Sequence, residues 1–165
     1  MSTFAFVNTY AFTVTHVTNK LLLSLKEIIR ETGLDVAKLT KQWSVLELGV
    51  STWIGSKHLE TVTLEIFDSK KDDLVGRWDI EIVYGYVGDG SLWVDTDAIK
   101  YSIRKAGLVP AGCDYRIVVS RKPNAPAVDG WSNCTLRSTD GFYRYSIGTT
   151  IGGSGLGAGV AYWGR

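Results

Sequence analysis

The sequence predicts an α+β fold, and three observations support this class. Apolar residues recur at helical spacing in the first third of the chain, alternate with polar residues in the middle, and lie among many glycines near the end. The 165 residues, 45% of them hydrophobic, suffice for one globular domain with a sizeable core. We therefore expect helices packed on one face of an antiparallel sheet, followed by a C-terminal segment of different character.

Two helices are expected before the sheet. Residues 4–14 alternate in polarity and are rich in aromatic and β-branched types, which is typical of an extended segment. Apolar residues then recur at helical spacing from Thr15, a candidate N-cap, to Gly33. Asp35 is the candidate cap of a second helix, in which apolar residues repeat at steps of three and four up to Gly55.

A hairpin is expected next. Residues 62–66 and 78–84 alternate apolar with polar types on either side of a turn at residues 68–73. We expect the polar face of this hairpin to be solvated, as in an antiparallel sheet with one face in water. That face carries Thr61, Thr63, Glu65, Arg77, Asp79 and Glu81.

A short helix that starts at Asp95 or Thr96 and a strand over residues 115–119 complete the predicted core. Three antiparallel strands leave at least one edge without a partner, and the last strand is the natural candidate. The pattern does not indicate which edge the following segment covers. In the loop before the helix, Tyr86 and Trp93 are candidates for contact with a partner.

The ending, residues 131–165, combines glycine with aromatic anchors. Eight glycines lie between Gly141 and the last residue. Glycine gives the backbone freedom at an entropic cost, and the aromatic and aliphatic side chains between the glycines supply contacts that can hold a conformation. The pattern indicates a mobile tail that repacks or clasps something, and not a part of the core.

Charge and hydropathy exclude several classes of partner. A net charge of +1 provides no basic field for nucleic acid, so we expect no direct nucleic-acid binding. The N-terminus lacks the pattern of a secretory signal, and no apolar run is long enough to span a membrane. We therefore expect a soluble, cytoplasmic protein.

No motif in the chain indicates catalysis. Residues 153–158 match the form G-x-G-x-x-A, but they lack the following helix and acidic residue of a dinucleotide site. The histidines, His16 and His58, have no metal-site spacing, and Cys113 and Cys134 are interpreted as reduced thiols. We expect no enzymatic activity, no metal and no cofactor.

Six internal stretches and the ending of the chain carry a family resemblance. They are residues 13–17, 77–85, 88–96, 105–110, 130–132 and 137–141, with residues 154–156 and 162–163 at the end. In these residues the chain resembles the bacterial HORMA domain proteins that are encoded beside cGAS/DncV-like nucleotidyltransferases in anti-phage CBASS operons. The resemblance runs along nearly the whole chain.

This resemblance implies a fold: three helices on a three-stranded antiparallel sheet, with a C-terminal "safety belt". It implies a single HORMA domain over residues 1–165. Within it, residues 1–14 are an extended N-terminal segment, residues 15–124 are the core and residues 125–165 are the belt.

The resemblance also implies a function. In this family the belt wraps around a "closure motif" peptide that adds as a strand to the sheet edge, and the closed form binds and activates the nucleotidyltransferase, which makes a second messenger for anti-phage defence. An AAA+ ATPase remodeller engages the N-terminal segment and opens the closed form. The implied protein is a conformational switch in signalling.

Carried onto this sequence, the resemblance implies two sets of site residues. The peptide-binding set is Asp114, Tyr115, Arg116, Ile117, Val118, Val119, Trp131, Tyr145, Tyr162 and Trp163. The remodeller-binding set is Ser2, Thr3, Phe4 and Phe6.

Two other functions remain open at this point. The first is a constitutive scaffold of the nucleotidyltransferase complex, with no peptide trigger. The second is a small enzyme with a cryptic site at His16, His58 or Cys113, for which no catalytic spacing is present. Self-association through an extended terminus is a further possibility, because another copy of the chain can supply the captured segment.

Overall fold

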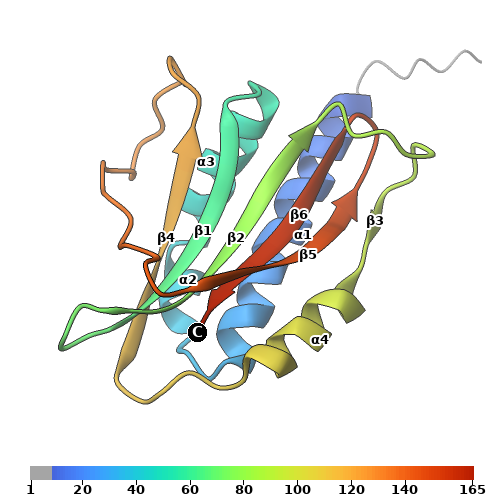
Figure 1. Cartoon of the computed structure of the whole chain (residues 1–165). Coiled ribbons are helices and arrows are strands. Elements are labelled where there is room, and N and C mark those ends of the chain that lie inside the picture. The colour runs from blue at the N-terminus through green and yellow to red at the C-terminus, as the bar shows by residue number, and fades with distance from the viewer. Residues whose placement is uncertain (1–8) are drawn as a thin grey trace, which may run out of the picture.

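The computed structural model describes residues 9–165, which form four helices and six strands (Figure 1). In chain order these are α1 (Thr9–Glu31), α2 (Ala37–Lys41), α3 (Trp43–Gly55), β1 (Leu59–Asp68), β2 (Leu74–Tyr84), β3 (Trp93–Val94), α4 (Thr96–Ala106), β4 (Cys113–Arg121), β5 (Tyr143–Gly152) and β6 (Leu156–Gly164).

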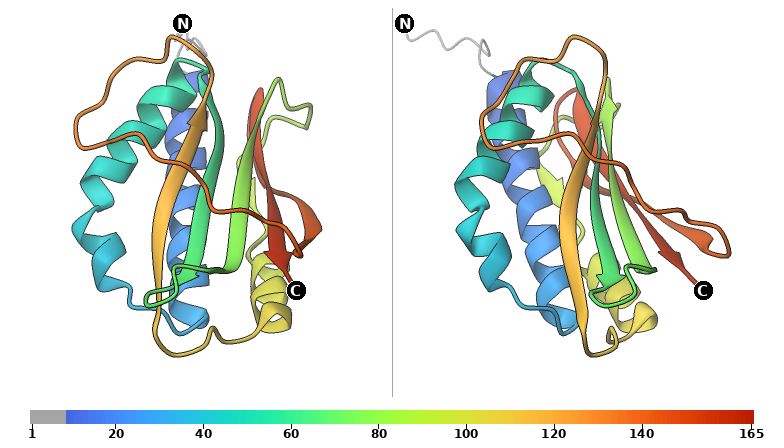
Figure 2. Two further views of the ribbon diagram at one scale, coloured as in Figure 1. Left: turned by 60° about the vertical axis from the view of Figure 1, so that its left-hand side comes forward. Right: turned by 90° about the vertical axis from the view of Figure 1, so that its left-hand side faces the viewer.

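The six strands form one antiparallel sheet in the order β3-β5-β6-β2-β1-β4, and the helices lie against one of its faces (Figure 2). The predicted α+β class and the three core strands, β1, β2 and β4, are confirmed. The sheet is wider than expected because β3, β5 and β6 extend it beyond β2. The predicted open edge is confirmed as well, since β4 ends the sheet.

The N-terminal segment differs from the prediction. Helix α1 begins at Thr9, so residues 9–14 are helical and not extended, and Thr15 lies inside the helix. The helix continues upstream because Val14 packs in the core together with Val17, three residues later. Over so few residues, an alternating pattern and a helical pattern cannot be told apart in the sequence. Residues 1–8, which include the predicted remodeller contacts Ser2, Thr3, Phe4 and Phe6, lie outside the described residues.

The predicted second helix is two helices, α2 and α3, which meet at Gln42. The long-range cause is Tyr115 on β4, whose hydroxyl accepts from Leu39 N at 3.2 Å and donates to Asp35 O at 2.5 Å. These bonds hold α2 against the sheet edge, while α3 packs on α1. The helix break thus serves two separate contacts.

The third predicted helix begins and ends as expected. Asp95 Oδ1 accepts from Ala98 N at 3.0 Å, which is the N-cap bond, and Gly107 follows the last turn with φ of 80°. Asp95 N also donates to Thr150 O at 2.7 Å, which fixes the start of α4 against the end of β5.

The polar face of the hairpin is not fully solvated, contrary to the prediction. Glu65 is completely buried, and Thr63 and Asp79 are nearly so. Asp79 accepts hydrogen bonds from Thr63 Oγ1, Arg77 and Trp163 Nε1, at 2.7 to 3.1 Å. Alternation identifies this face correctly, but it cannot reveal that later parts of the chain cover it.

The C-terminal residues are also part of the core, contrary to the prediction of a mobile tail. Strands β5 and β6 pair with each other, and β6 pairs with β2 along its length. Ile151, Leu156 and Val160 are buried in the hydrophobic core. The glycines here permit close packing, because a Cβ at Gly152 would overlap the indole of Trp93.

The ring of Tyr86 packs on Gly157 of β6, as Trp93 packs on Gly152 of β5: a Cβ at Gly157 would lie 3.1 Å from the Tyr86 ring. The two aromatic rings lie 6.4 Å apart. Trp93, on β3, therefore packs against β5, and Tyr86, in the loop after β2, packs against β6. Their contact with a partner stays a prediction.

Candidate functional site

Strand β4 is the long edge of the sheet that has one neighbour among the described residues. It pairs with β1 in an unbroken register from Ser120 to Cys113. Residues of an antiparallel strand direct their main-chain groups alternately toward and away from the partner. Tyr115 directs its carbonyl outward, to Lys38, so Ile117 and Val119 direct their main-chain groups outward too. The edge therefore has N–H and C=O groups that an added strand can pair with.

A segment without regular secondary structure, residues 122–142, connects β4 to β5 and passes around this edge; we call it the strap. Figure 2 shows its path: from the end of β4 it runs out over α3 and then crosses the β4 and β1 strands on the other side to reach β5. The strap thus encircles the β4 edge from the helical face to the opposite face.

One anchor of the strap lies on helix α3. Trp131 packs edge-on against Trp53, with ring centroids 5.0 Å apart, and its Nε1 donates to Val45 O at 3.3 Å. Trp53 Nε1 in turn donates to Pro126 O at 2.7 Å. The indole of Trp131 lies over Gly49, where a Cβ would be 2.5 Å from its Nε1. Glycine is therefore required at this point of the helix for Trp131 to seat.

The second anchor is a buried ion-pair network on the opposite face. Glu65 accepts from Arg137 N at 2.7 Å, from Arg137 Nη1, and from Arg116 Nε at 2.6 Å. Arg137 also binds Asp72 Oδ1 at 2.5 Å, and Arg116 donates to Thr135 O at 2.5 Å. Burial alone lowers the pKa of Arg137, but its bonds to Asp72 and Glu65 outweigh this effect and raise it. Arg137 is held as a cation.

Between the two anchors, a cavity of about 250 Å³ lies against the β4 edge. Most of its lining residues are apolar, but polar groups, including those of Ser132 and Asn133, make up the larger part of its exposed surface. Among the described lining residues Arg121 is the one that carries a charge, and its guanidinium lies 4.6 Å from the ring centroid of Trp53. The lining residues are Trp53, Ile117, Val118, Val119, Arg121, Ala127, Val128, Trp131, Ser132, Asn133 and Cys134. The position of this cavity beside an open strand edge suits an extended peptide as its ligand.

The structure brings part of the predicted peptide-binding set together here. Ile117, Val118, Val119 and Trp131 line the cavity. The other three predicted residues of β4 have different positions: Tyr115 is buried against α2, and Arg116 is bound to Glu65. Asp114 is paired with Lys38 at 3.2 Å.

Three predicted residues lie elsewhere. Tyr145 is on β5, and Tyr162 and Trp163 are on β6, with β2 and β1 between them and β4. Tyr162 contacts Trp78 at a centroid distance of 4.6 Å. Burial, with a smaller contribution from Tyr145, raises the pKa of the Tyr162 hydroxyl. The structure does not bring these residues together with the cavity at the β4 edge.

Several residues of this site cannot be identified from the sequence. The helical spacing around Trp53 predicts a core residue, and the alternation around Glu65 predicts a residue on a solvated face. Neither pattern indicates a contact with the strap. Arg137 lies in a stretch that carried the family resemblance, but its charge gave no indication of its partner. Lys38 is an ordinary cation on a helix, and only the fold places it beside β4.

The candidate catalytic residues His58 and Cys113 do not lie together in the structure. His58 and Cys113 stand at opposite ends of β1, which at about 3.4 Å per residue separates them by roughly 30 Å. Cys113 and Cys134 are both free thiols. Within residues 9–165, no three His, Cys, Asp or Glu side chains are grouped so as to hold a metal ion.

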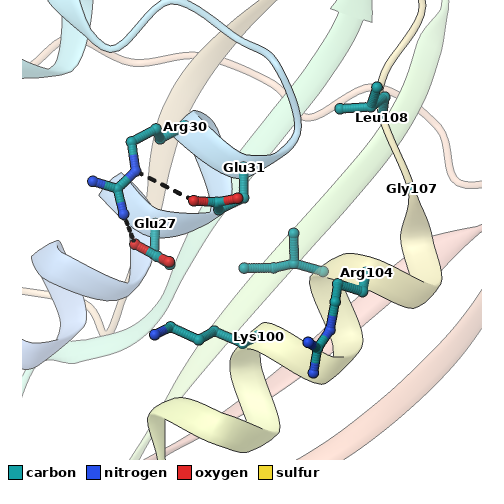
Figure 3. Close-up of a pocket in the computed structure, with 8 residues that line it drawn as sticks. Glu27, Arg30, Glu31, Lys100, Arg104, Gly107 and Leu108 are labelled. Carbon is teal, nitrogen blue, oxygen red and sulfur yellow. Dashed lines mark hydrogen bonds and ion pairs between the residues drawn. The ribbon is translucent and has the colours of Figure 1, made fainter.

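A second hollow, of about 500 Å³, lies between α1 and α4 (Figure 3). Its charged groups belong to the helix surfaces: Arg30 pairs with Glu27 at 2.5 Å and with Glu31 at 3.5 Å, and Lys100 and Arg104 lie on α4. It has no nucleophile next to a base among its described lining residues.

Among the described helices, none has the length and apolar character needed to cross a membrane.

Comparison with solved structures finds this fold in other proteins. One chain of the "Crystal Structure of Mitotic Checkpoint Complex" superposes with a TM-score of 0.80 at 11% identity, over 93% of this chain and 99% of that one. C. elegans HTP-1 bound to a HIM-3 closure motif gives 0.70 at 12% identity, over 92% and 89%. A chain of the E. coli MS115-1 CdnC:HORMA-deltaN complex gives 0.61 at 12%, over 99% and 91%. At such identities the likeness is one of fold.

Sequence comparison agrees with this fold. No curated protein matches the chain. The family model described as Bacterial HORMA domain 2 matches residues 1–165. With the core of three strands, the encircled edge and the full-length match in place, the chain belongs to the bacterial HORMA domain 2 family.

Proposed function

We propose that this protein captures an extended peptide at the β4 edge, beneath the strap. One observation carries the proposal: the strap encircles an edge whose outward main-chain groups lie beside a cavity that Trp53, Val128 and Trp131 help to line. A strand added there gains main-chain hydrogen bonds from the edge and specificity from the cavity. Solved structures of C. elegans HTP-1 and HTP-2, which have this fold and are bound to a HIM-3 closure motif, support the same mode.

The peptide-bound form is proposed to bind and activate a cGAS/DncV-like nucleotidyltransferase, and an AAA+ remodeller acting on the N-terminal residues is proposed to reopen it. Family membership supports this role, as does the bacterial CdnC:HORMA complex, whose chain has the same fold. The proposed protein is a regulatory subunit in anti-phage signalling, with no catalytic step of its own.

The test of peptide capture is selection of displayed random peptides on the full-length chain. The matched comparison is a variant with Val128→Asp, which puts a charge into the apolar wall of the cavity and leaves both strap anchors in place. We expect a shared motif from the unchanged chain and none from the variant. A motif that both chains enrich equally would place the binding site elsewhere.

The test of signalling uses the selected peptide and the nucleotidyltransferase encoded beside the chain. We expect cyclic nucleotide synthesis to rise only when the enzyme, the HORMA protein and the peptide are all present. Equal synthesis with and without peptide would instead support a constitutive scaffold.

A further inference from the structure

One end of the β4 edge is already occupied by side chains of this protein. Tyr115 N donates to Asp114 Oδ1 at 2.7 Å, and Lys38 Nζ donates to Tyr115 O at 2.5 Å. Lys38 and Asp114 also pair with each other at 3.2 Å. Both outward main-chain groups of Tyr115 are therefore satisfied without any added strand.

The next outward positions along the edge have no such partners. Within residues 9–165, no hydrogen bond from a turn, loop or side chain reaches the main chain of Ile117 or Val119. Beyond Arg121 the edge ends, because Lys122 N donates to His58 O at 2.7 Å and the chain leaves the sheet as the strap. The part of the edge open to pairing is thus limited to Ile117, Val119 and Arg121, the last residue of β4.

The cavity adjoins this short window. Its three residues all line the cavity, together with Trp53, Val128 and Trp131. A cavity of about 150 Å³ accommodates a benzene molecule, so the 250 Å³ found here admits one large aliphatic or aromatic side chain. Arg121 is the one charged residue among the described lining residues, and no carboxylate is there to offset it, so we expect a basic side chain to be excluded by like-charge repulsion.

We infer that Lys38 and Asp114 prevent the captured peptide from pairing with Tyr115, because they already bond the outward main-chain groups of that residue. We call this pair of residues the register stop. The ligand is a short extended segment that pairs with Ile117 and Val119, places one large apolar side chain between Trp53, Val128 and Trp131, and does not continue along Tyr115. The inference rests on the proposed function and defines the class of peptide at that same site. It makes Lys38 and Asp114 determinants of where the captured strand ends.

The experiment compares the unchanged chain with the double variant K38A/D114A. Both residues are substantially exposed, so their removal leaves the core intact. Lys41→Ala, on the same helix α2, is the matched control, because Lys41 is exposed and has no partner among the described residues. A motif is selected from random displayed peptides on each chain. The peptides are then synthesised with and without a further pair of residues at the end that faces Tyr115.

In the unchanged chain and in Lys41→Ala, we expect the extension to leave the affinity measured by fluorescence anisotropy unchanged. In K38A/D114A the freed groups of Tyr115 can pair, and the extended peptide should bind roughly five-fold more tightly than the short one. Hydrogen exchange gives an independent readout. Peptide should slow the exchange of the Ile117 and Val119 amides in all three chains. The Tyr115 amide is already bonded to Asp114 in the unchanged chain and in Lys41→Ala, so peptide should slow its exchange only in the double variant.

The outcomes separate the stop from the function it rests on. A motif whose extension strengthens binding equally in the unchanged chain and in K38A/D114A overturns the stop and leaves peptide capture standing. A selected motif with a basic residue at the position that enters the cavity overturns the inferred peptide class. Failure of every chain to select any motif overturns the proposed function, and this inference with it.

Discussion

The backbone N–H of Arg137, in the strap, donates to Oε2 of Glu65, on the central strand β1, across 2.7 Å. This bond ties an irregular segment directly to a carboxylate with no exposed surface. Arg116, from the edge strand, binds the same carboxylate, so the strap and the strand that it encircles share one buried counterion.

Arg137→Met removes one cation of this network and leaves Glu65 with Arg116 as its remaining cation, beside the backbone N–H of residue 137. Loss of one partner of a buried ion pair is costly because the remaining charge stays desolvated, and we expect the free energy of unfolding to fall by about 3 kcal/mol. Chemical denaturation measures it. The control is Arg144→Met, which breaks the exposed pair between Arg144 and Glu81 and should cost at most about 1 kcal/mol. Equal losses in the two variants would show that the network contributes no more than a surface pair.

Gly49→Ala should release the strap at its other anchor. Alanine normally favours a helix over glycine, but here its Cβ would lie 2.5 Å from Nε1 of Trp131 and displace the indole. We expect faster tryptic cleavage after Arg121, where the strap begins beside Trp53, in the native protein. Gly55→Ala, on the same helix with nothing within 4 Å of the new Cβ, should leave the cleavage rate unchanged. A slow rate in both variants would mean that Trp131 is not needed to hold the strap.

Gly152→Ala should destabilise the belt strands. The new methyl group would overlap the indole of Trp93, and overpacking of this kind costs about 1 to 3 kcal/mol. Thermal unfolding checks the loss. Adding Trp93→Leu makes room for the methyl group, so the double variant should be more stable than Gly152→Ala alone. A further loss in the double variant would contradict the contact as the cause.

The two thiols should react differently with iodoacetamide. Burial, and to a smaller extent the Asp68 carboxylate, raise the pKa of Cys113, so its thiolate fraction at a given pH is reduced and its labelling should require higher pH. Cys134 is exposed and lines the cavity. Labelling followed by mass spectrometry should therefore modify Cys134 first at neutral pH, and a captured peptide should protect it. Asp68→Asn should shift the labelling of Cys113 toward lower pH.

The sequence predicts the locally encoded parts of this fold well. The hairpin, the cap of α4 at Asp95 and the edge position of β4 follow from alternation, capping residues and strand order. The start of α1 and the break at Gln42 do not, because each depends on what the segment packs against. Tyr115, more than seventy residues downstream, holds α2 in place.

The sequence could not indicate which edge the belt pairs with. Strands β2 and β4 both offer an edge, and the choice of β2 is stabilised by contacts between distant residues. Tyr162 packs on Trp78, and Trp163 donates to Asp79 at 2.9 Å. The burial of Glu65 escaped prediction for the same reason: alternation assigns a residue to a face of the sheet and says nothing of a later segment that crosses it.

The path of the strap has a consequence for the solution behaviour of the protein. Edge strands that are long and apolar template the addition of other chains and promote aggregation. Ile117, Val118 and Val119 form such a run at the end of this sheet, and residues 122–142 lie across the approach to it. The strap therefore guards the sheet against self-templated growth as well as enclosing a ligand. Each time it opens, the protein exposes the surface most prone to aggregate.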